Sequence, residues 1–315
     1  MVSEKRKNIL LVTLSNIGDV VLTTPVISSL YSNFPGARIT VVVGPRAAGL
    51  LRGSRQIERL LVYDKESGWR EKLGFVRELR KEAYDWVVDL KNSALPFLVR
   101  AHRRSPMFRS FRSKSARGQH LEVLEKMGLL EEVQADSLRS PRFDFFSEAD
   151  ETNLSEKLNK KGRCLSSSWV VVAPGAGSEA KRWRIEGFCE VADRLLEASS
   201  FNMAVVGDVS EKLLGAKLAE IDSSRILNLT GETTLRELAA LVSRAKLILS
   251  NDSACMHLGY ELARPVVALF GPTDHVRYGR EDTRWRIVRD PVIEKIPAQK
   301  VFEACSQLLN PAPSF

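Results

Sequence analysis

The sequence predicts an α/β protein of two doubly wound, Rossmann-like parallel sheets facing across a cleft. Short runs rich in Val and Ile alternate with segments of helical length, which is typical of βαβ units. The alternation runs through the first half of the chain and restarts in the second half. The chain has 315 residues, whereas a single domain usually has roughly 100 to 200. Two domains of similar size are therefore expected.

The first domain is expected to span residues 1–150. Its first helix is expected to begin at Asp19, because apolar residues follow at helical spacing. Another helix is expected over residues 120–130, and the domain boundary near residues 145–155. The expected strands of this domain are residues 8–14, 38–43, 57–63 and 85–90.

The second domain is expected to span residues 151–297. Its strands end in Gly, Pro, Asn or Asp, and open α/β sheets bind ligands outside the carboxyl ends of their strands. An amphipathic helix is expected over residues 298–309, and we expect the segment 298–315 to pack back on the first domain. The expected strands are residues 169–174, 201–208, 225–231, 245–252 and 264–274.

The composition indicates a cytoplasmic globular protein. Apolar residues make up 44% of the chain and charged residues 27%, which is ordinary for folded domains. The N-terminus has a basic start but only a short apolar run, so we interpret it as a first strand rather than a signal peptide. No run approaches the roughly eighteen apolar residues of a membrane span. The 4 Cys are widely spaced, which indicates reduced thiols and no zinc site.

Positive charge is concentrated in the first half. Residues 1–150 hold 25 Lys and Arg against 18 Asp and Glu, whereas residues 151–315 hold 22 against 21. The segment 100–120 holds 7 basic residues and no acidic one. Such a run marks either a solvated face or a surface for an anionic partner. The candidate partners are anionic lipid head groups, an anionic or phosphorylated acceptor, and nucleic acid.

Two common nucleotide-binding motifs are missing. G-x-G-x-x-G does not follow the first strand, and G-x-x-x-x-G-K-[ST] occurs nowhere. A dinucleotide-dependent dehydrogenase and a P-loop kinase are therefore both disfavoured. The sequence has no D-x-D pair either, so we expect no metal site.

Polar residues beyond the strand ends have both structural and functional interpretations. Asp19 ends the segment SNIGD, with Gly18 at a tight turn, and an aspartate there is more often a helix cap than a catalytic group. Lys181 follows a loop whose glycines, Gly175 and Gly177, allow the backbone to approach a phosphate closely. A lone loop lysine is usually solvated.

The segment NDSACMH raises the same alternatives at the start of another helix. Asp252 and Ser253 are N-cap candidates, and the amides of that turn also form an anion site. His257 alone would more often be a satisfied interior residue. Glu211, after the strand at 201–208, either accepts hydrogen bonds from ribose hydroxyls or is an exposed helix residue.

Three segments resemble the ordered motifs of the glycosyltransferase family 9 heptosyltransferases, which build the inner core of bacterial lipopolysaccharide. They are SNIGDVVLTTPVISSL, APGAGSEAKRW and LTGETTLRELAALVSRAKLILSNDSACMHLGYELARPVVALFGPTD. The resemblance implies a GT-B fold and inversion at the anomeric carbon. It also implies that the C-terminal domain binds a nucleotide-sugar donor, usually ADP-heptose, and that the N-terminal domain binds the acceptor. The donor is a co-substrate, so no cofactor or bound metal is expected.

The resemblance also implies roles for individual residues. Inverting transfer needs a base for the acceptor hydroxyl and stabilisation of the departing diphosphate. The resemblance assigns the role of base to Asp19 and the stabilisation of the diphosphate to Lys181. The sequence departs from the family pattern at Ala254 and Cys255, where Gly followed by Pro or an apolar residue is typical. The remaining expected donor-binding residues are Gly177, Ser178, Glu211, Asp252, Ser253, Ala254, His257 and Thr273.

The acceptor side is expected around the basic segment. Its candidates could bind carboxylates or phosphates of an acidic glycolipid acceptor. The same segment could instead rest on the anionic cytoplasmic face of the inner membrane. The expected acceptor-binding residues are Asn92, Arg104, Arg109, Arg117 and His120.

Three classes of function are therefore weighed. The favoured one is an inverting glycosyltransferase acting on a lipopolysaccharide inner-core or similar glycan. The second is a sugar or nucleotide-sugar binding protein of the same fold without turnover. The third is a nucleic-acid-binding protein, but the basic segment has few aromatics and matches no recognition motif. We therefore expect no nucleic-acid partner.

Overall fold

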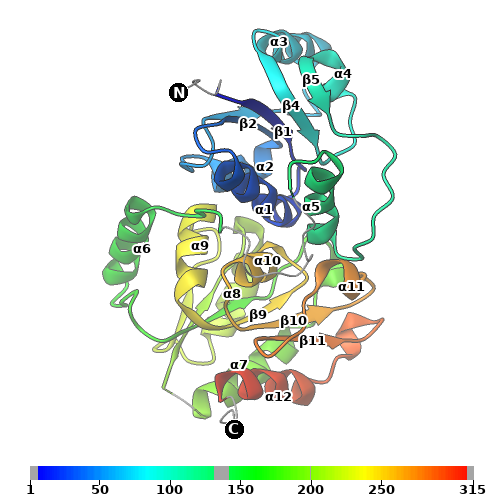
Figure 1. The fold of residues 1–315 in the computed structure, drawn as a ribbon. Helices are drawn as coiled ribbons and strands as arrows, with labels where there is room; N and C mark the ends of the chain where they lie inside the picture. The colour runs from blue at the N-terminus through cyan, green and yellow to red at the C-terminus, as the bar shows by residue number, and fades with distance from the viewer. Residues whose placement is uncertain (1–5, 131–141, 199, 311–315) are drawn as a thin grey trace. The chain divides into compact units, whose positions relative to one another are not determined.

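The computed structural model describes residues 6–130, 142–198 and 200–310, and it has the predicted α/β fold with two parallel sheets (Figure 1). The chain divides into two compact units between Phe145 and Phe146. The expected boundary was near residues 145–155, with the domains divided after residue 150. The observed division lies at the start of that range because α6 (Glu148–Lys160) belongs to the second unit, where it packs on α9 (Leu235–Arg244).

The first unit contains a five-stranded parallel sheet in the order β3-β2-β1-β4-β5. The central strand β1 pairs with β2 on one side and β4 on the other, so the order reverses between β1 and β4. The first four strands confirm the sequence prediction. The edge strand β5 was missed because its sequence, RAHRR, has no apolar alternation. The strands are β1 (Asn8–Val12), β2 (Arg38–Val43), β3 (Arg59–Val62), β4 (Ala83–Asp89) and β5 (Arg100–Arg104).

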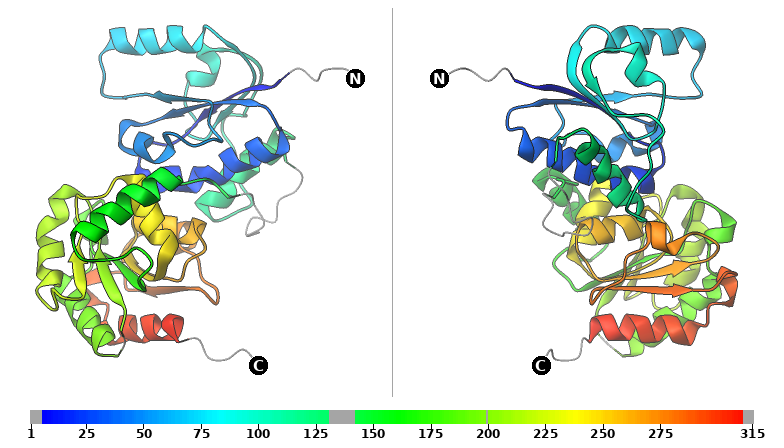
Figure 2. Two further views of the ribbon diagram at one scale, coloured as in Figure 1. Left: turned by 90° about the vertical axis from the view of Figure 1, so that its left-hand side faces the viewer. Right: turned by 45° about the vertical axis from the view of Figure 1, so that its right-hand side comes forward.

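The two faces of this first sheet are covered unequally. Helices α1, α2 and α5 lie on one face, and α3 and α4 lie on the other (Figures 1 and 2). Helix α1 begins at Ile17 rather than at Asp19, and it buries every residue from Val20 to Leu30. On the opposite face, α4 has only 4 residues. The helices are α1 (Ile17–Asn33), α2 (Pro45–Leu51), α3 (Trp69–Leu79), α4 (Leu95–Leu98) and α5 (Ala116–Lys126).

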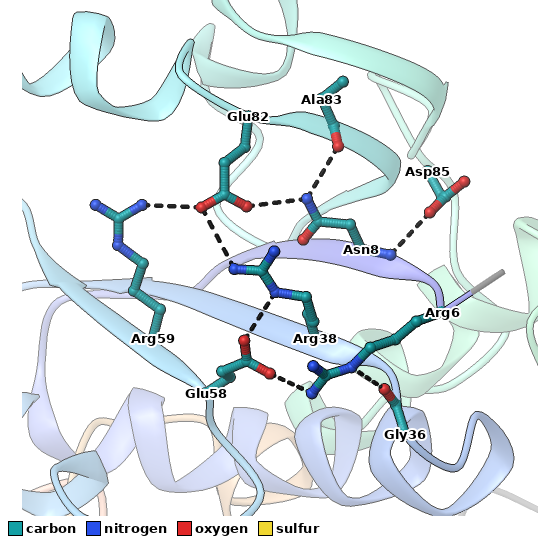
Figure 3. Close-up of polar contacts among 9 residues, drawn as sticks. All are labelled: Arg6, Asn8, Gly36, Arg38, Glu58, Arg59, Glu82, Ala83 and Asp85. Carbon is teal, nitrogen blue, oxygen red and sulfur yellow. Dashed lines mark hydrogen bonds and ion pairs between the residues drawn. The ribbon is translucent and has the colours of Figure 1, made fainter.

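An ion-pair network joins the amino ends of the strands in this sheet (Figure 3). Arg38 Nε lies 2.7 Å from Glu58 Oε1, and another Arg38 nitrogen lies 3.7 Å from Glu82 Oε1. Arg59 reaches the same Glu82 oxygen at 3.2 Å. Asn8 Nδ2 donates to the other Glu82 oxygen at 3.0 Å. Because opposite charges satisfy each other here, this end of the sheet is held together by the network rather than prepared for an anionic ligand.

The second unit contains a six-stranded parallel sheet in the order β11-β10-β9-β6-β7-β8. Its first strand, β6, is internal, and the order reverses between β6 and β9. Five of these strands were predicted. The edge strand β11 was not, because charged residues interrupt its short apolar pattern, WRIVR. The strands are β6 (Trp169–Ala173), β7 (Asn202–Val205), β8 (Ile226–Asn228), β9 (Ala245–Asn251), β10 (Val266–Phe270) and β11 (Trp285–Arg289).

Short helices follow most strands of the second unit. No helix in the described ranges is both long and apolar enough to cross a membrane. The remaining helices are α7 (Ile185–Glu197), α8 (Lys212–Ala219), α10 (Ala254–Glu261), α11 (His275–Tyr278) and α12 (Ala298–Leu309). Three single 3₁₀ turns are η1 (Glu179–Lys181), η2 (Val209–Glu211) and η3 (Ile293–Lys295).

Helix α12 has the predicted limits but not the predicted neighbour. Val301 and Cys305 are fully buried in the core of the second unit, together with Phe188 of α7. The expectation that the segment 298–315 packs on the first domain is therefore corrected for its described part, since residues 311–315 lie outside the described ranges. An amphipathic pattern shows that one helix face is buried, but it does not identify what buries that face.

Candidate functional site

Two loops meet at the point where the order of the second sheet reverses. One loop follows β6 and contains Gly175 and Lys181, and the other follows β9 and contains Asp252. Because β6 and β9 are hydrogen-bonded neighbours, both loops leave the same carboxyl edge of the sheet. In open α/β sheets this reversal is where ligands bind.

Lys181 and Asp252 form an ion pair across this reversal. Lys181 Nζ donates to Asp252 Oδ2 at 2.7 Å. The Asp252 residue is only 7% exposed, whereas the lysine side chain is 35% exposed. The other oxygen of Asp252 lies 3.9 Å from Nε2 of the buried His257, and the lysine ammonium lies 6.0 Å from the ring centre of Tyr278. A buried carboxylate thus holds a partly exposed cation where an anionic ligand can reach it.

Helix α10 begins directly after this pair. Ser253 is its N-cap residue, but its hydroxyl bonds Ser250 Oγ at 2.8 Å, and no side-chain cap is formed within the described residues. The expectation that Asp252 or Ser253 caps the helix through its side chain is therefore corrected. The first amides of α10, starting with Ala254, are left for an external acceptor. His257 lies in the same helix and is buried.

Asn251 connects the two loops, and sequence reasoning missed it. Its side chain is fully buried. Its Oδ1 accepts a hydrogen bond from the backbone N–H of Trp183 at 3.1 Å, and its Nδ2 donates to the carbonyl of Pro174 at 2.8 Å and to that of Gly175 at 3.3 Å. The one available signal was a polar residue that ends an otherwise apolar strand.

Glu211 lies against the glycines of two strand ends. A Cβ atom on Gly175 would stand 1.7 Å from Glu211 Oε1, and one on Gly207 would stand 2.3 Å from Oε2. The carboxylate accepts the N–H of Asp208 at 3.0 Å. Burial raises the pKa of Glu211, and hydrogen bonds from the amides of Asp208 and Ala176 oppose that shift. Glu211 is therefore half-buried beside the loop after β6, which excludes the exposed-helix interpretation.

The other expected donor residues lie at the outer part of the same edge. Gly177 and Ser178 are exposed, and a Cβ on Gly177 would meet nothing within 4 Å. A Cβ on Gly271, at the end of β10, would lie 3.0 Å from the carbonyl of Ala180, so the β10 loop borders the β6 loop. Thr273 is partly exposed in that β10 loop. Contacts join Lys181, Asp252 and His257 directly, whereas Ser178 and Thr273 only border this group.

In the first unit, Asp19 lies in the first turn of α1 and is partly buried. The N-cap residue is Asn16, so the capping interpretation of Asp19 is corrected. Asn16 Nδ2 donates to Asp19 Oδ2 at 3.1 Å, which orients the carboxylate. No further hydrogen bond reaches Asp19 from the described part of the chain, so its second oxygen can accept a proton from a ligand. A negative charge in this turn interacts favourably with the helix dipole.

The end of β4, the neighbour of β1, contains a second carboxylate that sequence reasoning missed. Asp89 is 2% exposed, and it accepts the N–H groups of Lys91 at 2.8 Å and Ser93 at 2.5 Å. The turn brings Asn92 into the left-handed region, at φ 58°. Arg109 donates to the Asp89 carbonyl at 2.7 Å. Asp89 therefore shapes the turn that carries Asn92, and its carbonyl is bonded by Arg109.

Arg109 is the expected acceptor residue that the structure supports best. Burial lowers the pKa of its guanidinium, and the Asp89 carboxylate opposes that shift. Its NH1 nitrogen is buried and has no hydrogen-bond partner among the described residues. A buried guanidinium nitrogen without an acceptor suits an anionic ligand group.

The other basic candidates are placed differently. Arg104 donates to the backbone carbonyls of Pro96, Val99 and Ala101 at 2.7, 3.1 and 3.1 Å, so its guanidinium holds the chain between α4 and β5. Arg117 is buried in α5, and His120 is partly buried in the same helix. The segment 100–120 is thus divided among a strand, a loop and a helix.

The described residues contain no group of three His, Cys, Asp or Glu side chains that could hold a metal ion. The carboxyl edge of the second sheet carries the Lys181 cation and the first amides of α10. In the first unit, the carboxylate is that of Asp19 and the guanidinium is that of Arg109.

Comparisons with known proteins match most of the chain to one family. The sequence model of "Glycosyltransferase family 9 (heptosyltransferase)" matches residues 73–305. The chain is 28% identical to lipopolysaccharide heptosyltransferase 3 of Escherichia coli K12 over 343 aligned positions, covering 94% of this chain and 97% of that protein.

Solved structures extend the agreement to the fold. A glycosyltransferase family 9 structure from Veillonella parvula superposes with a TM-score of 0.81 at 22% identity, covering 97% of this chain and 98% of that one. E. coli heptosyltransferase WaaC with ADP superposes with a TM-score of 0.76 at 19% identity, covering 96% and 99%. The two-sheet architecture is therefore the GT-B fold.

Proposed function

The chain belongs to glycosyltransferase family 9 (heptosyltransferase) and is a glycosyltransferase, and we propose that it transfers a heptose from ADP-heptose to the inner core of lipopolysaccharide with inversion. The observation that carries this proposal is the ion pair of Lys181 and Asp252 beside the uncapped start of α10. A cation and free helix amides at a strand reversal suit a diphosphate. The ADP named for the WaaC structure is consistent with this choice of donor.

In the proposed reaction, the acceptor oxygen attacks the anomeric carbon while the bond from that carbon to the diphosphate breaks. Asp19 takes the proton of the attacking hydroxyl, and Asn16 orients the carboxylate for this role. Lys181 and the first amides of α10 stabilise the negative charge that develops on ADP. Asp252 keeps the lysine ammonium in place.

The nucleoside part of the donor is proposed to lie near Glu211. Its half-buried carboxylate stands beside Gly175 of the phosphate-binding loop and suits ribose hydroxyls as hydrogen-bond donors. Gly177, Ser178, Thr273 and His257 are proposed to contact the diphosphate or the sugar. Ala254 adds a methyl group at the first turn of α10, next to that phosphate position.

The acceptor is proposed to be an anionic glycolipid at the cytoplasmic face of the inner membrane. Arg109, with its unpartnered buried nitrogen, is proposed to bind a carboxylate or phosphate of the acceptor. Asn92 is the second proposed contact, because it lies exposed on the turn after β4. Arg104, Arg117 and His120 are not required for this arrangement.

The donor site is tested by thermal shift with ADP, ADP-heptose and a panel of other nucleotides. We expect ADP and ADP-heptose to raise the midpoint and Lys181→Ala to abolish the rise. Lys246→Ala is the matched control, since this exposed lysine lies near the amino end of β9, away from the reversal. No response to any nucleotide would contradict the donor assignment.

The transfer itself is tested with ADP-heptose and heptose-deficient lipopolysaccharide. Asp19→Asn should retain the ADP-induced shift and lose at least about a hundredfold in transfer rate, the usual range for a lost general base. If the parent protein binds ADP-heptose but no acceptor receives a sugar, the protein is a non-catalytic binding protein instead. If Asp19→Asn retains turnover, Asp19 is not the base.

A further inference from the structure

The first unit contains a cavity of about 500 Å³, and none of the residues assigned to the transfer reaction lines it, although Lys91 and Ser93 on either side of Asn92 do. It lies at the carboxyl ends of β1 and β2 and is closed by α3, α4 and the turn after β4. Every residue that lines it belongs to the first unit. Its volume is within the range of small-molecule sites, roughly 300 to 1,000 Å³.

The cavity exists because one face of the first sheet is incompletely covered. On that face the only helices in the described ranges are α3 and the single turn α4 (Figures 1 and 2). Val12, Val42 and Leu95 line the cavity and also belong to the core cluster beneath these helices. The cavity is therefore an open continuation of the hydrophobic core.

Large apolar side chains at its rim remain exposed to solvent. Trp69 and Leu73 of α3 are 67% and 46% exposed, and both line the cavity. Leu98 of α4 lines it too and is 39% exposed, and its neighbour Phe97 is 60% exposed. Apolar groups gathered at a cavity mouth indicate an apolar partner more strongly than scattered ones do.

Two hydroxyl groups in the wall are already bonded to the protein. Thr13 donates to the carbonyl of Val42 at 3.0 Å, and Ser93 donates to the Asp89 carboxylate at 3.0 Å. No Asp, Glu, Asn or Gln lines the cavity. A sugar or a nucleotide needs polar side chains for its hydroxyls and base edges, so the wall suits a hydrocarbon chain instead.

Two lysines lie at this otherwise apolar site. Lys72 of α3 and Lys91 of the turn after β4 both line the cavity. Lys91 Nζ donates to Ser15 Oγ at 3.2 Å, and neither lysine forms an ion pair within the described residues. Two cations with no lining acid attract an anionic head group.

We propose that this cavity receives one acyl chain of an anionic membrane phospholipid, whose phosphate lies on Lys72 and Lys91. Trp69 then lies at the level of the head groups, where its amphipathic indole ring is stabilised, and the exposed Phe97 adds apolar contact with the bilayer. The first unit is held at the bilayer by this rim rather than by the basic segment 100–120.

The binding test uses two probes. Dioctanoyl phosphatidylglycerol below its micellar concentration tests the cavity, and the emission of Trp69 reports its entry. Vesicles of phosphatidylglycerol or of phosphatidylcholine test the membrane contact by cosedimentation. We expect saturable binding of the short-chain lipid, loss of its signal in Trp69→Phe, and vesicle binding that requires the anionic lipid.

Variants separate the chain from the head group. Ala94→Trp places a large side chain at an exposed position that lines the cavity, and it should abolish binding of the short-chain lipid. Lys72→Ala with Lys91→Ala should weaken vesicle binding about thirtyfold at low salt, because each lysine near an anionic surface contributes roughly a fivefold factor.

A second test variant combines Lys72→Glu with Leu73→Asp on α3. Its matched control combines Lys212→Glu with Leu213→Asp. Both pairs place an exposed leucine after a lysine, but Lys212 and Leu213 lie on α8 in the second unit. Only the α3 pair should lose lipid binding, with circular dichroism and the thermal midpoint retained.

Four results would overturn the proposal. Three are unchanged short-chain lipid binding in Ala94→Trp, equal binding to phosphatidylcholine vesicles, and equal loss in the α8 pair. The fourth is binding of heptose-deficient lipopolysaccharide at this cavity without any binding of phosphatidylglycerol, since the occupant would then be the acceptor. None of these measurements depends on turnover, so a failure of the proposed transfer reaction would leave this test intact.

Discussion

Alanine substitution of two glycines in the loop after β6, Gly175 and Gly177, should change the free energy of unfolding differently. Alanine at Gly175 would place its Cβ 1.7 Å from Glu211 Oε1, whereas alanine at Gly177 would meet nothing within 4 Å. Neither glycine has a positive φ, so backbone strain does not separate them. The difference between the two variants therefore measures the contact with the Glu211 carboxylate.

The magnitude follows from what Glu211 loses. The clashing atoms are at the end of a flexible side chain, so in Gly175→Ala the carboxylate rotates away and leaves the amides of Asp208 and Ala176. Hydrogen bonds to a charged group contribute about 1.5–3 kcal/mol each when buried, and less in this half-buried position. We expect Gly175→Ala to lower the free energy of unfolding by about 1–2 kcal/mol. Gly177→Ala should leave it unchanged or raise it by up to about 1 kcal/mol.

Urea unfolding of a double-mutant cycle isolates this contact. Glu211→Ala removes the carboxylate and the same hydrogen bonds, so Gly175→Ala should then add almost no further cost. The coupling free energy should be close to the cost of either single variant, about 1–2 kcal/mol. Both single variants should also reduce the rise in the thermal midpoint that ADP causes. Additive costs, or an equal effect of alanine at Gly177, would refute this explanation of the two glycines.

Three further predictions concern other contacts. Asp150→Ala should lower the free energy of unfolding by about 1–3 kcal/mol at pH 7, because its ion pair and capping box start α6. Although burial opposes it, hydrogen bonds from Ser147 lower the pKa of Asp150 from 3.8 in the folded state. Its contribution is therefore present above that pH and should disappear in urea titrations as the pH falls through the folded value. Arg109→Gln should raise the acceptor KM about tenfold or more without changing ADP binding, whereas Arg104→Gln, which loses only carbonyl contacts, should lower the thermal midpoint and leave KM unchanged. Asn251→Ala should cost about 1–3 kcal/mol in urea unfolding, since it leaves the buried N–H of Trp183 without an acceptor. A cost below 1 kcal/mol would show that the two loops do not depend on this amide.

The sequence predicted the buried strands well because burial leaves a direct compositional trace. Continuous runs such as WVVVA in β6 are apolar on both faces, as internal parallel strands require. The edge strands β5 and β11 leave no such trace, because β5 is mostly exposed, β11 is mostly only partly buried, and both carry arginines. The neighbour of α12 was mistaken because periodicity reports a buried helix face without naming its partner.

The candidate site was predictable where a residue type has few uses at a strand end. Lys181 and Asp252 are such residues, and the structure joins them at 2.7 Å. Asn251 and Asp89 were missed because their partners are backbone groups, which every sequence possesses. The contacts of Arg104 were missed for the same reason, since its guanidinium donates to three backbone carbonyls that no side-chain pattern indicates.

Both sheets have a reversal of strand order, but the side chains at the two reversals suit different chemical steps. In each unit the strand order reverses beside the first strand, between β1 and β4 and between β6 and β9, so two loops leave the same edge side by side. In the first unit that edge carries the Asp19 carboxylate and the Arg109 guanidinium, which suit a proton to be removed and an anion to be held. In the second unit it carries Lys181 and the uncapped amides of α10, which suit a leaving diphosphate. Removing the charged group should therefore have a different effect in each unit. Asp19→Asn should stop turnover with the donor bound, whereas Lys181→Ala should remove the donor before any chemistry begins.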